Sequence, residues 1–278
     1  MKKIGILAIL AALIIVSCKK TKTEDTVTET SRWTFDTLHL KKEIFLINDS
    51  TKGGLKLTLE FNYPSQFVND SILKAVQAHF LNSFTDDQSG AYKNMTPTKG
   101  FEAFTQANID ESIELGKDLK GIVNDFSEYY KTVRTSVSDT TLLSITGRTE
   151  MLQYSGGAHD SRYVYYTNID LRNGKLIGLD SLFKSGTSDK LLALIKEVLA
   201  TTKNSSGSDI TIMDPDSVEP SSNFYFGNKG VVFVYNTYDI TPYSDGLIQA
   251  VVPYEKLKDL ISDDYKDIIS QKAQNLSK

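Results

Sequence analysis

Apolar and polar residues alternate without interruption between Leu55 and Tyr63. Every second side chain in this stretch is Leu, Phe or Tyr, so one face of the extended chain is apolar and the other is polar. This period of two belongs to a β-strand that is buried on one side. Gly53 and Gly54 precede it as a turn, and we expect Pro64 to end it because proline cannot donate to a sheet ladder. The chain therefore needs a sheet with one face against a core.

Other segments rich in β-branched and aromatic residues indicate that this strand has several neighbours. From Lys131 onward Thr, Ser, Val and Tyr become dense, and residues 132–154 are predicted to form one long strand or a hairpin. Asn173 and Gly174 are a strong signal for a tight turn. The other predicted strands are residues 33–47, 162–171, 175–179 and 247–252, and a hairpin made of 223–226 and 231–235.

Helical periodicity occurs in a few separated segments. Apolar residues recur at intervals of three and four over residues 72–84, behind a cap at Asp70 or Ser71. Residues 101–130 are predicted to be a second helical stretch, with the clearest apolar stripe from Leu119 onward. Shorter helices are predicted at residues 180–183, 188–199, 254–261 and 265–271. Runs of strands interrupted by separated helices indicate an α+β fold with antiparallel sheets rather than a doubly wound fold.

The N-terminus has the layout of an exported lipoprotein. Two lysines precede an apolar run over residues 4–16, which has the length of a signal-peptide core and is too short to span a bilayer. The run leads into Cys18, the single cysteine of the chain, in a sequence that resembles a lipobox. We expect residues 1–17 to be removed as a signal peptide and Cys18 to carry a stable lipid anchor of several acyl chains. The alternative is an ordinary signal peptide with an incidental cysteine.

Residues 18–31 are rich in Lys, Thr, Glu and Asp and are predicted to form a solvated tether. We therefore expect a protein of the cell envelope, held through lipid on Cys18 at the periplasmic or the surface face of an outer membrane. The rest of the chain has globular composition, since the 278 residues are 40% hydrophobic and 10% aromatic. A net charge of -4 argues against nucleic acid as a partner, because nucleic-acid binding favours basic patches.

Two groups of motifs resemble a known family. The first group is Tyr154-Ser155-Gly156-Gly157-Ala158-His159, followed by Tyr163, Tyr165, Asn168, Asp170-Leu171, Gly174-Lys175 and residues 179–183. The second group is residues 223–226 and 230–235, Tyr238-Asp239-Ile240, Pro242-Tyr243, Gly246 and residues 252–260. Their order and spacing resemble the extracytoplasmic domain that RsiV-type anti-sigma factors share with the N-terminal part of PdaC-type peptidoglycan deacetylases. Much of that family is catalogued as domains of unknown function.

The resemblance covers about residues 41–261 and implies an α+β fold of two lobes. The expected boundaries are 32–131 for an N-terminal lobe with the long helices and 132–278 for a C-terminal RsiV/PdaC-like lobe. In RsiV-like members the domain binds lysozyme, and in PdaC-like members it accompanies a separate catalytic domain. This sequence shows neither a cytoplasmic segment with a spanning helix nor a further domain with metal-binding Asp and His residues. We therefore expect the fold and an envelope-binding role to carry over, and neither named activity as a whole.

His159 is the strongest candidate for a residue with a catalytic or binding role. Two glycines directly before it permit tight backbone geometry and close approach of a partner. A pair of Ser155 and His159 with an acid would be a nucleophile constellation, but Gln153 stands where a nucleophile elbow needs glycine. No second histidine lies at zinc-ligand spacing, so we expect no metal site and no cofactor. The alternatives for His159 are a structural turn residue and a binding residue.

Tyrosines and aspartates are dense between Tyr235 and Asp245. Aromatic faces beside carboxylates suit sugar rings, and tyrosine is also enriched at protein interfaces. The alternative is a crossing loop in which the tyrosines only pack. The expected binding residues are Tyr154, His159, Tyr163, Tyr238 and Tyr243.

The sequence thus predicts a lipid-anchored, non-catalytic envelope protein that recognises peptidoglycan, another cell-wall glycan, or a wall-active protein such as lysozyme. Two alternatives stay open: a structural or accessory subunit of an envelope assembly, and a peptidoglycan-modifying hydrolase that uses Ser155 and His159.

Overall fold

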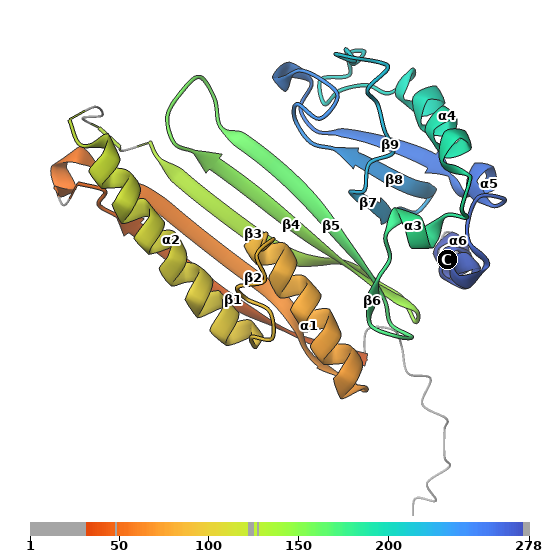
Figure 1. The fold of residues 1–278 in the computed structure, drawn as a ribbon, viewed down its shortest axis with the longest axis horizontal. Helices are drawn as coiled ribbons and strands as arrows, with labels where there is room; N and C mark the ends of the chain where they lie inside the picture. Colours follow the sequence, from red (N-terminus) through yellow and green to blue (C-terminus); the bar gives the residue numbers. More distant parts are fainter. Residues whose placement is uncertain (1–31, 48, 122–124, 127, 275–278) are drawn as a thin grey trace, which may run out of the picture.

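The computed structural model describes residues 32–47, 49–121, 125–126 and 128–274. Within these residues six strands form one sheet, in the order β1-β2-β3-β4-β5-β6, and three strands form a second sheet, in the order β7-β8-β9 (Figure 1). Helices accompany both sheets, so the predicted α+β class is confirmed. The signal peptide, Cys18 and the tether lie outside the described residues.

The larger sheet is mixed. Its strands are β1 Trp33–Ile44, β2 Leu55–Phe67, β3 Tyr130–Thr140, β4 Ser144–Tyr154, β5 Ser161–Asp170 and β6 Lys175–Leu176. Strands β2 and β3 run parallel, while the other neighbours are antiparallel. The expected antiparallel pairing therefore holds for every neighbouring pair of this sheet except β2 and β3. The physical reason is the crossover between β2 and β3, because a parallel pair needs a long connection and two helices provide it.

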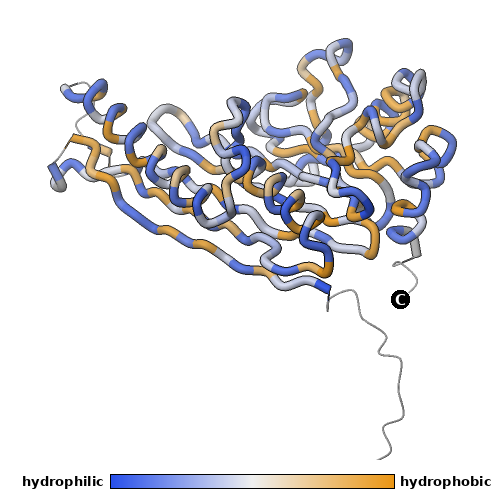
Figure 2. The backbone as a smooth tube through the Cα atoms, turned by 60° about the horizontal axis from the view of Figure 1, so that its bottom comes forward, coloured by the Kyte–Doolittle hydropathy of each residue, from blue (hydrophilic) through white to orange (hydrophobic). Residues whose placement is uncertain are grey.

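Strand β2 continues past Pro64 to Phe67, so the predicted end of this strand is wrong. Pro64 pairs with Phe35 of β1 next to a register shift. Strand β3 accompanies β2 only as far as Phe61. At Pro64 strand β2 therefore has a paired neighbour on one side only, β1. Because no strand pairs with its other side there, the missing N–H of proline is tolerated. The predicted alternation holds along β2, and its apolar side is buried; Figure 2 shows hydrophobic and hydrophilic residues alternating along the strands.

Helices α1 (Asp70–Thr85) and α2 (Pro97–Leu119) lie across one face of the larger sheet (Figure 1). Asn69 caps α1, since its side chain accepts from the backbone N–H groups of Ser71 and Ile72 at 3.0 and 3.1 Å. The apolar side of β2 packs beneath α1, where the rings of Phe61 and Phe84 stack with centroids 4.7 Å apart. This cluster is the core of the larger sheet.

The second helix ends at Leu119, so the predicted helical stretch is wrong for residues 120–121, 125–126 and 128–130, while residues 122–124 and 127 lie outside the described residues. Gly121 has a φ of +85°, a left-handed conformation that ends helices. Tyr130 instead begins β3 and pairs with Tyr154. The apolar spacing after Leu119 imitated a helix because Phe126 is also fully buried, although it lies outside any helix.

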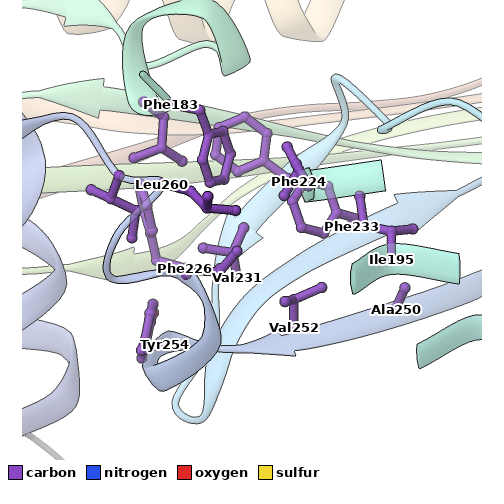
Figure 3. Packing of buried hydrophobic residues seen from close by; sticks show 14 of the residues in the cluster. Phe183, Ile195, Phe224, Phe226, Val231, Phe233, Ala250, Val252, Tyr254 and Leu260 are labelled. Carbon is purple, nitrogen blue, oxygen red and sulfur yellow. The ribbon is translucent and has the colours of Figure 1, made fainter. Parts of the chain in front are cut away.

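The predicted hairpin over residues 132–154 is confirmed as β3 and β4, and the turn at Asn173 and Gly174 is confirmed between β5 and β6. The smaller sheet consists of β7 Phe224–Phe226, β8 Gly230–Tyr235 and β9 Ile248–Pro253. The helices near it are α3 Leu179–Leu182, α4 Ser188–Leu199, α5 Tyr254–Leu257 and α6 Lys266–Gln274. The predicted helix over 254–261 is therefore shorter. Phe224, Phe233 and Ile195 of α4 meet in a separate core (Figure 3).

Side-chain amides join the two sheets along the outer edge of β5. The Oδ1 of Asn236 accepts from the Val164 N–H at 2.7 Å, and the Oδ1 of Asn223 accepts from the Tyr166 N–H at 2.9 Å. Asn223 also donates to the Val164 carbonyl at 2.6 Å, and Asn168 donates to the Phe224 carbonyl at 2.7 Å. Between Val164 and Asn168, before the short pairing with β6 begins, these amides take the place of a neighbouring strand and close the edge of β5.

The predicted lobe boundary between residues 131 and 132 falls inside β3. The two hydrophobic cores separate instead between Leu171, the last residue of the first, and Ile177, the first of the second. Strands β3 to β6 complete the larger sheet, so the first core needs them. In the part of the chain that the structure describes, no helix has the length and apolar character needed to cross a bilayer.

Candidate functional site

The candidate site is built around the loop between β4 and β5, residues 155–160, at the top of the larger sheet in Figure 1. Gly156 and Gly157 have φ values of +96° and +104°, so the predicted need for glycine geometry is confirmed at both positions. A Cβ on Gly156 would also stand 2.8 Å from the hydroxyl of Tyr129. Tyr154 donates a hydrogen bond to the Gly157 carbonyl at 3.0 Å, which holds the loop over the end of β4.

His159 contacts two tyrosines from a distant loop. Its ring stacks on Tyr243, with centroids 3.7 Å apart and planes 18° apart. Its Nδ1 lies 2.8 Å from the carbonyl oxygen of Asp160, and its Nε2 lies 3.1 Å from the hydroxyl of Tyr238. Because a carbonyl can only accept, Nδ1 carries a proton, and a ring without a second proton accepts from the Tyr238 hydroxyl through Nε2.

Asp160 ties three segments of the chain together. Its Oδ2 accepts from the hydroxyl of Tyr130 at 2.8 Å, and its Oδ1 accepts from the hydroxyl of Tyr243 at 2.9 Å. These two hydrogen bonds lower the pKa of the Asp160 carboxyl below its usual value. The same bonds raise the pKa of the Tyr130 and Tyr243 phenols. We call Tyr130, Tyr154, His159, Asp160, Tyr238 and Tyr243 the tyrosine–aspartate cluster.

The loop that carries Tyr238 and Tyr243 is fixed by its own hydrogen bonds. Tyr238 has a φ of +72°, which is rare for a residue other than glycine and marks a locally strained backbone. Asp239 accepts from the Asn236 N–H at 2.7 Å, and the side chain of Asn236 is bound to β5. The buried carboxylate of Asp245 accepts from the side chain of Asn204 at 3.1 Å. The rings are thus presented by a braced loop.

Tyr163 lies apart from the cluster. It pairs with Met151, which packs against the core beneath the helices, so both residues are on the helix-covered face of the sheet. There Tyr163 lies beside Tyr165, with centroids 6.4 Å apart and planes 10° apart. Both tyrosines line a cavity of 690 Å³, together with Lys131 and His159.

A second cavity, of 630 Å³, lies between the opposite face of the larger sheet and the loop that carries Tyr243. Arg148 and Arg162 line it, and both bind Glu150, at 3.1 and 2.5 Å. Burial disfavours the charged form of Glu150, but the hydrogen bond from Arg148 and the charges of both guanidinium groups outweigh burial and lower its pKa. Asp160 and Tyr243 are at this cavity as well.

The arrangement suits binding better than nucleophilic catalysis. The Nε2 of His159, its basic nitrogen, is already occupied by Tyr238 and is therefore engaged away from Ser155. In the ranges that the structure describes, no group of three or more His, Cys, Asp or Glu side chains is placed to hold a metal ion. Exposed aromatic rings can stack on a ligand, and a carboxylate beside them can accept hydrogen bonds from the hydroxyl groups of that ligand.

The structure brings four of the five expected binding residues together: Tyr154, His159, Tyr238 and Tyr243. Sequence reasoning missed Tyr130 and Asp160. Asp160 directly follows His159 and could have been found from that position. Tyr130 was assigned to a helix, and only its pairing with Tyr154 on β4 brings it to the site.

A family model and two solved structures that are similar to this chain carry the same family description. Residues 180–255 match the model of a family described as a protein of unknown function, DUF3298. The structure is similar to that of a DUF3298 family member from Bacteroides fragilis, with 23% identity, a TM-score of 0.73, and coverage of 87% of this chain and 98% of that one. It is also similar to a DUF3298 family protein from Pseudomonas aeruginosa, with 14% identity, a TM-score of 0.53, and coverage of 83% and 96%. No curated protein matches the chain.

Proposed function

We propose that this chain, whose residues 180–255 match the DUF3298 family model, is a lipid-anchored, non-catalytic binding protein of the cell envelope that recognises cell-wall glycan. This match and the similar fold of the DUF3298 protein from Bacteroides fragilis agree with the resemblance to the RsiV/PdaC-like domain family that the sequence indicated. That family has no assigned function, so the role is argued from the site. Cys18 would carry the lipid, as the lipobox-like sequence predicts.

The tyrosine–aspartate cluster is the observation that carries this proposal. Tyr238 and Tyr243 are 53% and 36% exposed, although large aromatic side chains are usually buried. Their rings offer apolar faces, and the carboxylate oxygens of Asp160 offer acceptors beside Tyr243. Sugars present the matching features, since a pyranose ring has an apolar C–H face and a rim of hydroxyl groups. A protein such as lysozyme is the competing partner, because exposed tyrosines also serve protein interfaces.

Co-sedimentation with insoluble peptidoglycan tests the proposal. Residues 32–278, which include every described element, are incubated with the wall in parallel samples with and without lysozyme. We expect the protein to pellet with the wall when lysozyme is absent. A protein that stays in the supernatant in both samples contradicts the proposal, and one that pellets only with lysozyme identifies lysozyme as the partner.

Variants of Tyr243 locate the binding. Tyr243→Ala removes both the stack on His159 and the hydrogen bond to Asp160, whereas Tyr243→Phe keeps the ring and removes the hydroxyl. We expect Tyr243→Ala to lower the bound fraction strongly and Tyr243→Phe to lower it less. Phe35→Ala is the matched control, because Phe35 is 37% exposed on β1, away from the cluster. Circular dichroism checks that each variant folds.

A further inference from the structure

Two cavities of similar size lie on opposite faces of the larger sheet, at the end where β4 turns into β5. The 690 Å³ cavity is on the helix-covered face and holds Tyr163 and Tyr165. The 630 Å³ cavity is on the other face, against the loop of the smaller sheet. Leu152 lines both, and the consecutive residues His159 and Asp160 line one each. The two cavities are thus neighbours across the tip of one hairpin.

The charged groups around both cavities are balanced. Arg148 and Arg162 face the 630 Å³ cavity, and the carboxylates of Glu150 and Asp160 lie beside them. The lining of the 690 Å³ cavity includes both Lys131 and Asp86, and Lys131 forms an ion pair with Glu111 at 3.9 Å. A charged ligand would have to compete with these groups, at a desolvation cost that an uncharged ligand avoids. The charge pattern therefore favours a neutral, polar occupant.

Tyrosines line both cavities. Tyr163 and Tyr165 lie side by side in the first, and Tyr166 and Tyr243 line the second. An extended peptide would gain most from an open strand edge. The outer edge of β5 is already closed by Asn223 and Asn236. Stacking surfaces without a free edge suit sugar rings better than a peptide strand.

We propose that the two cavities are subsites of one path around the β4–β5 loop, and that the path takes an uncharged glycan chain long enough to occupy both. This inference rests on the proposed function and specifies its ligand as a polymer rather than a single sugar. Each cavity has the volume of an ordinary small-ligand site. A chain that fills both binds the second site as an intramolecular event, which raises its affinity over that of a short fragment.

Calorimetric titration with β-linked N-acetylglucosamine oligomers of increasing length tests the path. We expect weak binding of the disaccharide and a rise of roughly a hundredfold in affinity once the oligomer reaches both cavities, followed by a plateau. Equal affinity for short and long oligomers, or no binding of any oligomer, overturns the inference. Tighter binding of an uncharged peptide than of any oligomer overturns it as well.

One variant in each cavity shows whether both take part. Tyr163→Ala alters the first cavity and Tyr243→Ala the second, and each should return the long oligomer to the affinity of a short one. Phe35→Ala should leave the length dependence unchanged. If only one of the two tyrosine variants removes the rise, the path is refuted. A protein that still pellets with peptidoglycan but shows no rise with length keeps the proposed function and loses only this inference.

Discussion

Asp160 holds the tyrosine–aspartate cluster together, because each of its carboxylate oxygens accepts from a different tyrosine. Tyr130 comes from β3 and lies 30 residues away along the chain, and Tyr243 lies 83 residues away. A charged acceptor makes stronger hydrogen bonds than a neutral one. The charge state of this one side chain therefore sets the geometry of the cluster.

The tyrosine–aspartate cluster should be stable over a wide pH range, and protonation of Asp160 sets its acid limit. The pKa of Asp160 is lower in the folded protein than in the unfolded chain. Its contribution to the free energy of unfolding is therefore complete above the usual pKa of about 3.9 and is lost as the pH falls through the lowered value. The phenol pKa values are raised, so their contribution is complete below about 10 and is lost as the pH rises through the raised values. Asp160 is only partly buried, so we expect its hydrogen bonds to contribute at most about 1 kcal/mol to the free energy of unfolding.

Urea denaturation at a series of pH values measures this contribution. Asp160→Asn keeps the shape of the side chain and removes its titration, so the difference between the two proteins should shrink as the pH falls below about 4. A difference that stays constant with pH would show that the charge of Asp160 is irrelevant.

Gly116 shows that a helical position can require the absence of a side chain. It lies in α2, and a Cβ there would stand 1.8 Å from the carbonyl oxygen of Leu46. Alanine favours a helix interior by about 1 kcal/mol over glycine. The contact is with backbone, which cannot rotate away, so we expect Gly116→Ala to destabilise the protein by about 2 kcal/mol or more. Chemical denaturation measures the change in the free energy of unfolding. Gly178→Ala is the control, because a Cβ at Gly178 would meet nothing within 4 Å.

At the scale of elements, strand β5 depends on side chains along part of one edge. Strand β4 pairs with one side of β5; on the other side β6 pairs only with Ile169 and Asp170, and Asn223 and Asn236 bond the backbone at Val164 and Tyr166. Removing an amide would leave a buried backbone donor without a partner, which costs about 1–3 kcal/mol. The smaller sheet is thus held to the larger one by directional bonds in addition to packing.

Hydrogen exchange at single amides tests this dependence. In Asn236→Ala we expect the Val164 amide to exchange faster and the free energy of unfolding to fall by about 1–3 kcal/mol. In Asn223→Ala we expect the same at Tyr166. Asn62→Ala is the control, since Asn62 bonds Thr37 on the exposed side of β2, and it should change stability by about 0.5 kcal/mol or less. Unchanged protection of Val164 and Tyr166 would contradict the role of the amides.

At the scale of the whole molecule, two hydrophobic cores meet at β5. The first core includes Ile169 of β5, and the carbonyl of Phe224 in the second core accepts from Asn168 of the same strand. Opening either core would expose buried polar groups of the junction, so their unfolding is coupled.

We therefore expect a single unfolding transition for the intact protein in differential scanning calorimetry. The double variant Asn223→Ala with Asn236→Ala removes the amide junction and should separate this into two transitions, one for each core. Two transitions in the intact protein would show that the cores are independent.

The sequence by itself determined the order and the kind of most elements. Three local patterns predicted elements that the structure contains: the alternation along β2, the turn at Asn173 and Gly174, and the periodicity of α1 and α4. Local patterns failed after Leu119 because an apolar spacing of three and four also arises where a buried side chain such as Phe126 lies outside any helix. They failed at Pro64 because the tolerance of a strand for proline depends on its neighbours.

Only the tertiary structure decided how the site is assembled. The antiparallel pairing of β3 with β4 brings Tyr130 beside Tyr154, and the Asn236 contact brings Tyr238 and Tyr243 to His159. The same alternation that predicted β5 places Tyr163 on the opposite face from the cluster. These contacts join segments that are far apart in the chain, so their geometry depends on strand order and register rather than on any local pattern.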